Sequence, residues 1–208
     1  MEVRQIIVIG GSAGSFEPLK LILSSLSENL DASIFIVIHT SGEREHTLDK
    51  VLGRSSLLPV RNAQDDEPFQ KGVYLAPSDR HLTISASGVT RVARGPKENR
   101  FRPAIDPLFR SAAIAFGPSV TGVILSGALD DGSAGLWAIK SQGGTTIVQN
   151  PEDAVIPFMP LNAIKNVQPH HCVPAQEIAS LLISGGASRL AGRLNHSAYH
   201  KTMETEIK

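Results

Sequence analysis

Residues 5–26 read QIIVIGGSAGSFEPLKLILSSL and join three patterns in one short stretch. The four branched apolar residues at 6–9 are typical of a strand that is buried on both faces. A glycine-rich turn follows at 10–14, and a helix-like apolar pattern begins at Phe16. The one serine in this turn, Ser12, has three candidate uses: cradling a phosphate, acting as an exposed nucleophile, or completing a plain turn.

Further apolar runs of the same kind recur along the chain, at 34–38, 120–125 and 145–148. Helix-like segments lie between them, at 16–26, 106–116 and 133–140. Strands that alternate with helices indicate βαβ units with right-handed crossovers. We therefore predict an α/β fold with a doubly wound, mainly parallel sheet.

Two segments depart from this rhythm. Residues 81–93, HLTISASGVTRVA, alternate with period two around Ser87-Gly88, which predicts an antiparallel β-hairpin near one edge of the sheet. From residue 184 onward the chain loses apolar density, so we expect a weakly packed or disordered tail over 184–208.

The bulk composition is that of an ordinary globular protein. The 208 residues fit one domain, with 20 Lys and Arg balancing 20 Asp and Glu, so no overall field favours nucleic acid or an anionic membrane. A single cysteine, Cys172, fits a reducing compartment, and no apolar run approaches the roughly 20 residues of a membrane helix. We expect a cytoplasmic protein with no membrane insertion, and the near-neutral charge gives no reason to expect more than a monomer.

Polar residues follow three of the predicted strands. Ser12 follows the first, His39 the second, and Asp130 and Asp131 the third. Because ligands gather at the carboxyl ends of parallel strands, a serine, a histidine and an aspartate are expected on one edge of the sheet. A hydrolytic triad needs this arrangement, but the arrangement alone does not establish one.

Each of these residues also has a plainer interpretation. The turn lacks the glycine spacing of a dinucleotide site and the ending of a P-loop, although GGSAG matches G-x-S-x-G. In α/β-hydrolases, however, the acid precedes the histidine, whereas here His39 precedes the aspartates. His39 can be a hydrogen-bonded strand-end histidine, and the DDG segment can be a turn or a helix cap. We expect no metal site, because no His or Glu stands at ligand spacing from the two aspartates.

A basic cluster follows the predicted hairpin, at Arg91, Arg94, Lys97, Arg100 and Arg102. Such a run is usually a solvated face, but it can also attract an acidic partner. There is too little aromatic interleaving to predict nucleic-acid binding.

Six blocks of the sequence together resemble the chemotaxis protein-glutamate methylesterase family, that is, the CheB catalytic domain. They are VIGGSAGSFEPL (8–19), FIVIHTS (35–41), VYLAPSDRHL (73–82), RFRPAIDPLFRSAA (100–113), VILSGALDDGSAGLWAIKSQGGTTIVQNPEDA (123–154) and MPLNAI (159–164). The resemblance covers roughly residues 4 to 183. It implies a catalytic domain over 1–183, with a three-layer α/β/α fold.

The resemblance also implies an activity and its residues. The family hydrolyses methyl esters on glutamate side chains of methyl-accepting chemotaxis receptors, and some members deamidate receptor glutamines. The family's nucleophile falls on Ser12, its histidine on His39 and its aspartate on Asp131 rather than Asp130. The oxyanion donors fall on the backbone N–H groups of Ala13 and Ala128. Typical members carry Met-Gly where Ala128 and Leu129 stand here, a departure that bears on the oxyanion site.

Several further expectations follow. The partner is the cytoplasmic helices of a methylated receptor, with Arg94 and Arg100 helping to dock them, and no cofactor is required. The Ser12 strand starts within a few residues of Met1, so we expect a stand-alone form without a receiver domain. Two alternatives stay open: an esterase or deamidase of the same chemistry acting on another protein or a small ester, and a non-catalytic interaction module.

Overall fold

The apolar run at 6–9 forms the interior of the first strand, β1 (Gln5–Gly11). The structure, a computed structural model, describes residues 5–39 and 48–185. The remaining elements are α1 (Phe16–Ser25), β2 (Ala32–Ile38), α2 (Leu48–Gly53), β3 (Val60–Asn62), β4 (Glu67–Pro68), β5 (Gly72–Leu75), β6 (His81–Ile84), β7 (Val89–Ala93), α3 (Ile105–Phe116), η2 (Gly117–Ser119), β8 (Val120–Ile124), α4 (Ser133–Ser141), β9 (Thr145–Gln149), α5 (Phe158–Val167), β10 (His171–Val173) and α6 (Ala175–Ile183).

The main sheet is parallel, in the order β10-β9-β8-β1-β2-β5-β3. After β1, the strands β2, β3 and β5 are added on one side of it, and the later strands β8, β9 and β10 are added on the other side. The order of the strands therefore reverses between β1 and β8, and the carboxyl edge at such a point is where open α/β sheets bind ligands. The predicted doubly wound parallel sheet is confirmed.

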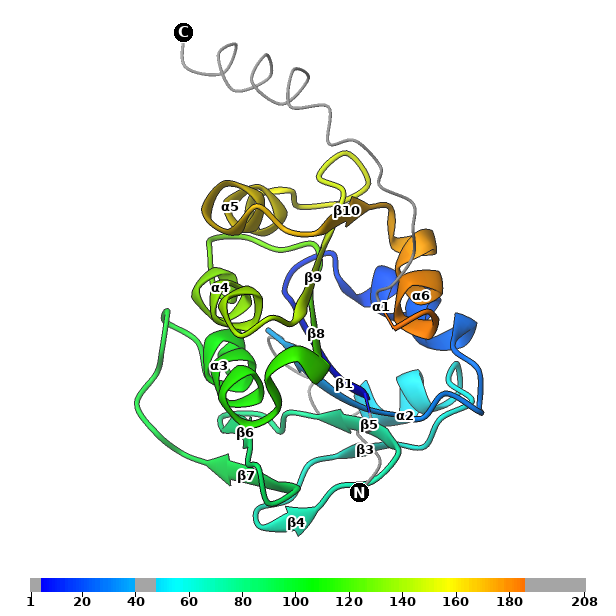
Figure 1. Cartoon of the computed structure of the whole chain (residues 1–208), viewed down its shortest axis with the longest axis vertical. Coiled ribbons are helices and arrows are strands. Elements are labelled where there is room, and N and C mark those ends of the chain that lie inside the picture. The colour runs from blue at the N-terminus through cyan, green and yellow to red at the C-terminus, as the bar shows by residue number, and fades with distance from the viewer. Residues whose placement is uncertain (1–4, 40–47, 186–208) are drawn as a thin grey trace, which may run out of the picture.

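Helices cover both faces of this sheet, with α3, α4 and α5 on one side and α1, α2 and α6 on the other (Figure 1). The four apolar residues of β1 divide between the two layers. Ile6 and Val8 pack in the core under α3 and α4, whereas Ile7 and Ile9 pack in the core under α1 and α6. A continuous apolar run is what a strand needs when both of its faces are covered.

The predicted hairpin is present as β6 and β7, but it does not join the main sheet. It pairs with β4 in a separate three-stranded antiparallel sheet. Leu82, Ile84 and Val92 pack into the core that contains α3, so burial of these side chains holds the hairpin against the helix layer. The sequence pattern found the hairpin but not β4.

The predicted tail lies mostly outside the described residues, because the description ends at residue 185, two residues after α6. None of the helices in the described part of the chain is both long and apolar enough to cross a membrane.

Candidate active site

Ser12 lies at the carboxyl end of β1, beside the point where the strand order reverses. Its backbone N–H donates to the Ser126 carbonyl, 2.9 Å away, which ties the turn to the segment that follows β8. Its own carbonyl accepts the backbone N–H and the hydroxyl of Ser15, at 3.0 and 2.6 Å. Helix α1 starts at the next residue. These bonds hold Ser12 on a fixed turn between strand and helix.

Two glycines make room for this turn. Gly14 has φ +82°, a conformation that side chains disfavour, and a Cβ there would lie 2.6 Å from both Ser126 Oγ and Val155 Cβ. A Cβ on Gly127 would lie 2.8 Å from the Ser12 Cβ. The backbone after β8 therefore passes directly against Ser12, and only glycine permits so close an approach.

His39 is placed beside Ser12 by the register of two neighbouring strands. Gly11 of β1 pairs with Ile38 of β2, and the next residues are Ser12 and His39. The His39 N–H donates to the Gly11 carbonyl at 3.0 Å. The imidazole is 6% exposed, its Nε2 lies 2.8 Å from Asp131 Oδ2, and the Phe101 ring stacks on it at a centroid distance of 3.7 Å.

The two ring nitrogens of His39 have different surroundings. Nε2 is hydrogen-bonded to the Asp131 carboxylate, which makes Nε2 the protonated nitrogen of the neutral ring. Nδ1 is buried and has no hydrogen-bond partner among the described residues. Nδ1 is therefore the nitrogen left to accept a proton from a neighbouring hydroxyl, the reverse of the usual assignment in serine proteases.

Asp131 is fully buried and accepts four different donors. Besides His39, these are the backbone N–H groups of Ile105 (2.8 Å) and Asp106 (3.2 Å) and the side-chain amide of Asn99 (2.8 Å). The two N–H groups belong to the first turn of α3, whose own N-cap residue provides no side-chain bond. Asp131 thus caps α3 from another segment, and the helix dipole favours its negative charge.

These donors decide the charge state of Asp131. Burial by itself raises the pKa of the carboxyl, but the hydrogen bonds from His39, the Ile105 N–H and Asn99 outweigh it and lower the pKa below its ordinary value of 3.8. Asp131 is ionised at neutral pH and can stabilise a protonated His39.

The lowered pKa predicts how acid affects stability. A carboxyl with a lower pKa in the folded state contributes stability that is present above its unfolded value and lost as the pH falls through the folded one. We expect the urea midpoint of the wild type to fall more steeply than that of Asp131→Asn as the pH drops from 5 through 3.8 and below. Parallel midpoint curves for the two proteins would contradict this.

Because the Phe101 ring stacks on His39, we expect its removal to lower the turnover rate. Phe101→Leu removes the ring that stacks on His39, the candidate base, and in enzymes a small misplacement of such a group costs up to about 100-fold in rate. We expect kcat to fall by about tenfold or more. The matched control is Phe69→Leu, since Phe69 contacts Phe35, Tyr74 and Phe116 rather than the site, and it should lower the melting temperature but not kcat.

The proposed oxyanion donors flank Ser12. Ala13 follows it directly, and Ala128 follows the glycine that passes against it. Neither of these backbone N–H groups donates a hydrogen bond to another described residue. Free N–H groups next to a nucleophile are what an oxyanion site requires.

The sequence candidates Asp130, Arg94 and Arg100 make no hydrogen bond to Ser12, His39 or Asp131 among the described residues. Asp130 is exposed, and its side chain makes no bond to His39. Arg94 pairs with Asp79 at 2.9 Å, and Arg102 donates twice to the same carboxylate. Arg100 is exposed and stands between Asn99 and Phe101 in the chain, which brings it next to the site.

The sequence did not predict the roles of Asn99, Phe101 or Ser126. Asn99 and Phe101 come from an irregular loop some 60 residues after His39, with no strand or helix period to mark them. Ser126 is fully buried, and its hydroxyl donates to the Ala13 carbonyl at 2.9 Å and accepts the Ile156 N–H at 2.9 Å. One signal was present: all three lie in the blocks that carry the family resemblance or beside them.

A serine next to a buried histidine whose far nitrogen binds a buried carboxylate is the arrangement of a serine hydrolase. The CheB methylesterase family model matches residues 7–182. The chain belongs to the CheB methylesterase family.

Individual relatives agree with this. A Xanthomonas campestris protein named protein-glutamate methylesterase/protein-glutamine glutaminase 1 is 35% identical over 184 residues, which cover 86% of this chain but only 51% of that protein. A Leptospira interrogans protein, provisionally given the same kind of name, is 35% identical over 178 residues, covering 85% of this chain and 92% of the relative. The crystal structure of the Thermotoga maritima CheB methylesterase catalytic domain matches with a TM-score of 0.83 at 33% identity, over 87% of this chain and 98% of that one.

Proposed function

We propose that this protein hydrolyses methyl esters on glutamate side chains of methylated chemotaxis receptors, with Ser12 as nucleophile, His39 as base and Asp131 as its partner. The observation that carries the proposal is the His39–Asp131 bond of 2.8 Å beside Ser12, in a chain of the CheB methylesterase family. Residues 1–183 form the proposed catalytic domain.

The reaction proceeds in two halves. Ser12 Oγ attacks the ester carbonyl while its proton passes to His39 Nδ1, and Asp131 stabilises the imidazolium that results. Collapse of the tetrahedral intermediate expels the methoxy group, which takes the proton from Nδ1 and leaves as methanol. Water then attacks the acyl-enzyme by the same route and releases the glutamate carboxylate. A glutamine amide enters the same sequence with ammonia as the leaving group.

Backbone donors stabilise the negative charge that develops on the carbonyl oxygen. The Ala13 and Ala128 N–H groups serve this purpose, and loss of one such donor costs roughly 3–4 kcal/mol in a comparable protease. Because the donors are backbone groups, alanine at 128 supplies the same N–H as the methionine that is typical of the family.

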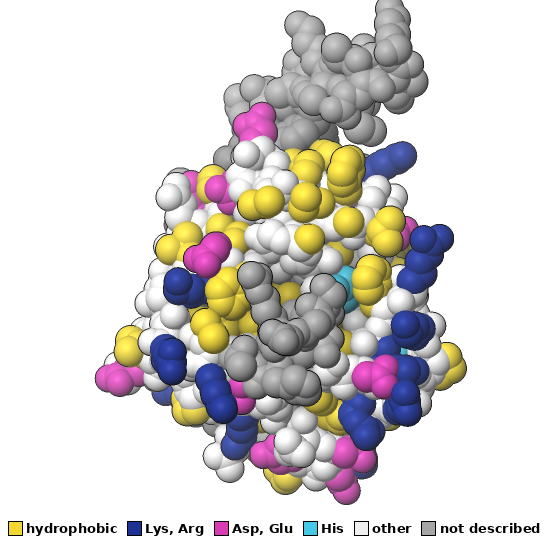
Figure 2. Space-filling model, turned by 180° about the vertical axis from the view of Figure 1, so that it is seen from behind, with side chains coloured by type: hydrophobic (Ala, Val, Ile, Leu, Met, Phe, Trp, Pro, Cys, Tyr) yellow, Lys and Arg dark blue, Asp and Glu magenta, His cyan; other side chains and the backbone are white. Residues whose placement is uncertain are grey.

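Exposed apolar side chains surround the serine turn and fit the side of a substrate helix. Val155 is 72% exposed and reaches Gly14, while Phe158 belongs to the segment that is hydrogen-bonded to Gly127 through Ile156 and Met159. Leu129 is exposed directly after Ala128. Figure 2 shows a face on which hydrophobic side chains gather and Lys and Arg side chains lie along both sides. Such a surface fits a helix that carries apolar and acidic groups.

Charge reversal at the two proposed docking residues, Arg94 and Arg100, should have effects of different size. Arg94 is paired with Asp79, which Arg102 also binds, whereas Arg100 is exposed and precedes Phe101 in the chain. We expect Arg100→Glu to raise KM for methylated receptor several-fold at low salt and less at high salt, because screening weakens surface charges. Arg94→Glu should have a smaller effect. If the double variant demethylates receptor at the wild-type rate at low salt, the docking idea is wrong.

Methanol release from methylated receptor, compared between wild type and Ser12→Ala, tests the proposal. Release by the wild type alone supports it. Activity on a generic ester without any on receptors would favour a different substrate for the same chemistry. Activity on neither methylated receptor nor a generic ester would favour the remaining alternative, a non-catalytic interaction module.

A further inference from the structure

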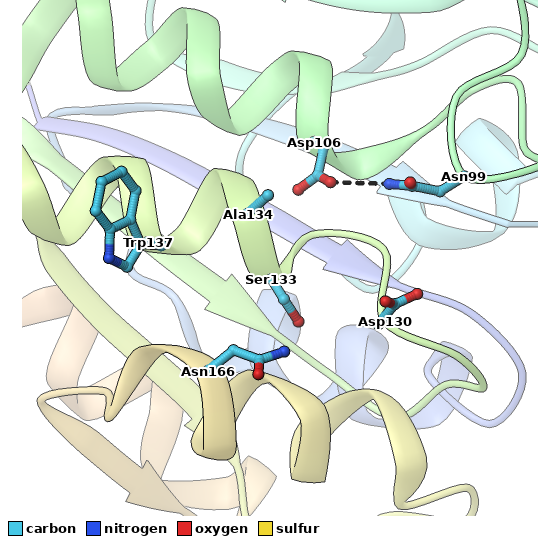
Figure 3. A pocket seen from close by; sticks show the side chains of 7 residues that line it. All are labelled: Asn99, Asp106, Asp130, Ser133, Ala134, Trp137 and Asn166. Carbon is cyan, nitrogen blue, oxygen red and sulfur yellow. Dashed lines mark hydrogen bonds between the residues drawn. The ribbon is translucent and has the colours of Figure 1, made fainter.

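A cavity of about 390 Å³ lies beside the Asp131 loop, between the first turns of α3 and α4 and the end of α5. Figure 3 shows the side chains that line it: Asn99, Asp106, Asp130, Ser133, Ala134, Trp137 and Asn166. The Asn99 side chain and the Asp106 backbone N–H donate to Asp131, and the other lining residues have no role in the proposed hydrolysis.

The lining offers negative charge and hydrogen-bond acceptors. It contains two carboxylates, Asp106 and Asp130, and two carboxamides, but no Lys, Arg or His. Asp106 is 4% exposed, and it accepts the Gly135 N–H at 2.7 Å and the Asn99 amide at 2.8 Å. Burial first, and then the neighbouring Asp131, raise the pKa of Asp106 despite these bonds. A cation in the cavity would offset both effects.

The hydroxyl of Ser133 is a buried polar group in the wall of this cavity. Ser133 is 6% exposed, and its Oγ has no hydrogen-bond partner among the described residues. In Figure 3 this hydroxyl lies between Asp130 and Asn166. Buried polar atoms are nearly always hydrogen-bonded, so this hydroxyl has a hydrogen bond to offer to a water or a ligand group in the cavity.

Two further features select the kind of ligand. Trp137 is 59% exposed on α4, at the end of the cavity away from Asp130 (Figure 3), and an exposed indole face attracts organic cations. The start of α4 would by itself favour an anion, but the Gly135 N–H is occupied by Asp106 and the Ser133 N–H donates to the Asp130 carbonyl. Because these two N–H groups already have acceptors and two carboxylates line the cavity, an anion would bind there unfavourably.

We propose that this cavity binds an organic cation, a guanidinium group attracted by the negative charge of Asp106 and Asp130, with Trp137 lining the far end of the same cavity. The guanidinium belongs either to a small free molecule or to an arginine side chain of a partner protein. The site does not depend on the proposed esterase activity.

The chain contains a single tryptophan, so its fluorescence reports on this site directly. We expect agmatine, titrated into the full chain, to change the Trp137 emission to saturation, while the neutral analogue butylurea and the anion succinate do not. Saturation with an arginine-containing peptide but not with agmatine would identify a protein side chain as the source. The absence of a saturable change with either at millimolar concentration overturns the proposal.

Two variants locate the bound cation. Asn166→Lys places an ammonium group at the wall of the cavity and should raise the apparent Kd by roughly tenfold or more, as should Asp130→Lys. The matched control is Ser180→Lys, which adds the same charge to an exposed position of α6 on the other face of the sheet (Figure 1). Equal binding by Asn166→Lys and Ser180→Lys would show that the ligand binds elsewhere.

Discussion

Replacing Ser12 by alanine will lower methanol release from methylated receptor by at least about 10⁴-fold, because the variant has no oxygen to form the acyl-enzyme. Removal of the nucleophile of a serine protease lowers kcat by about 10⁶-fold. The rate enhancement that remains comes from the oxyanion donors and from substrate binding. The fold should be unaffected, since the Ser12 hydroxyl makes no hydrogen bond to another described residue and its backbone bonds to Ser126 and Ser15 remain.

The measurement is single-turnover methanol release, with the urea midpoint measured on the same preparation. Ser24→Ala is the matched control, because Ser24 is exposed on α1 and bonds only the Leu21 carbonyl. It should retain the wild-type rate. A Ser12→Ala protein that keeps more than about a tenth of the wild-type rate would place the nucleophile elsewhere.

Asp131→Asn carries the second large effect, on both rate and stability. An amide nitrogen in place of one carboxylate oxygen would face donors on either side. At Oδ2 it would face His39 and the Ile105 N–H, and at Oδ1 it would face Asn99 and the Asp106 N–H. The equivalent change in a serine protease lowers kcat by about 10⁴ through the wrong histidine tautomer. Here we also expect a loss of about 2 kcal/mol of stability, because the same carboxylate caps α3 with charge-assisted hydrogen bonds.

The neighbouring acid gives the control. Asp130→Asn makes the same chemical change one residue away, at an exposed carboxyl that does not contact His39. We expect kcat within about twofold of wild type, as for most surface changes away from a site. If the two variants lose activity equally, the loop as a whole rather than the Asp131 carboxylate supports the reaction.

The sequence was sufficient for part of this site. His39 directly follows a long apolar run and Ser12 follows one after two glycines, so both were expected at the carboxyl edge of the sheet. That their two strands are neighbours was decided by the tertiary structure. Asp131 is seven residues beyond the end of β8, and spacing alone could not separate it from Asp130. The choice of Asp131 came from the family resemblance, and the bond to His39 agrees with it.

The sequence by itself determined the α/β class, the hairpin and the turn that carries Ser12, because apolar periodicity and glycine turns are local signals. Only the tertiary structure decided which groups meet Asp131 and His39. Asn99 and Phe101 come from a loop in which Asn99 and Arg100 have positive φ, and no pattern marks such a loop. The cavity beside Trp137 likewise exists only because α3, α4 and α5 pack together on one face of the sheet, and packing of distant segments leaves no periodic trace in the chain.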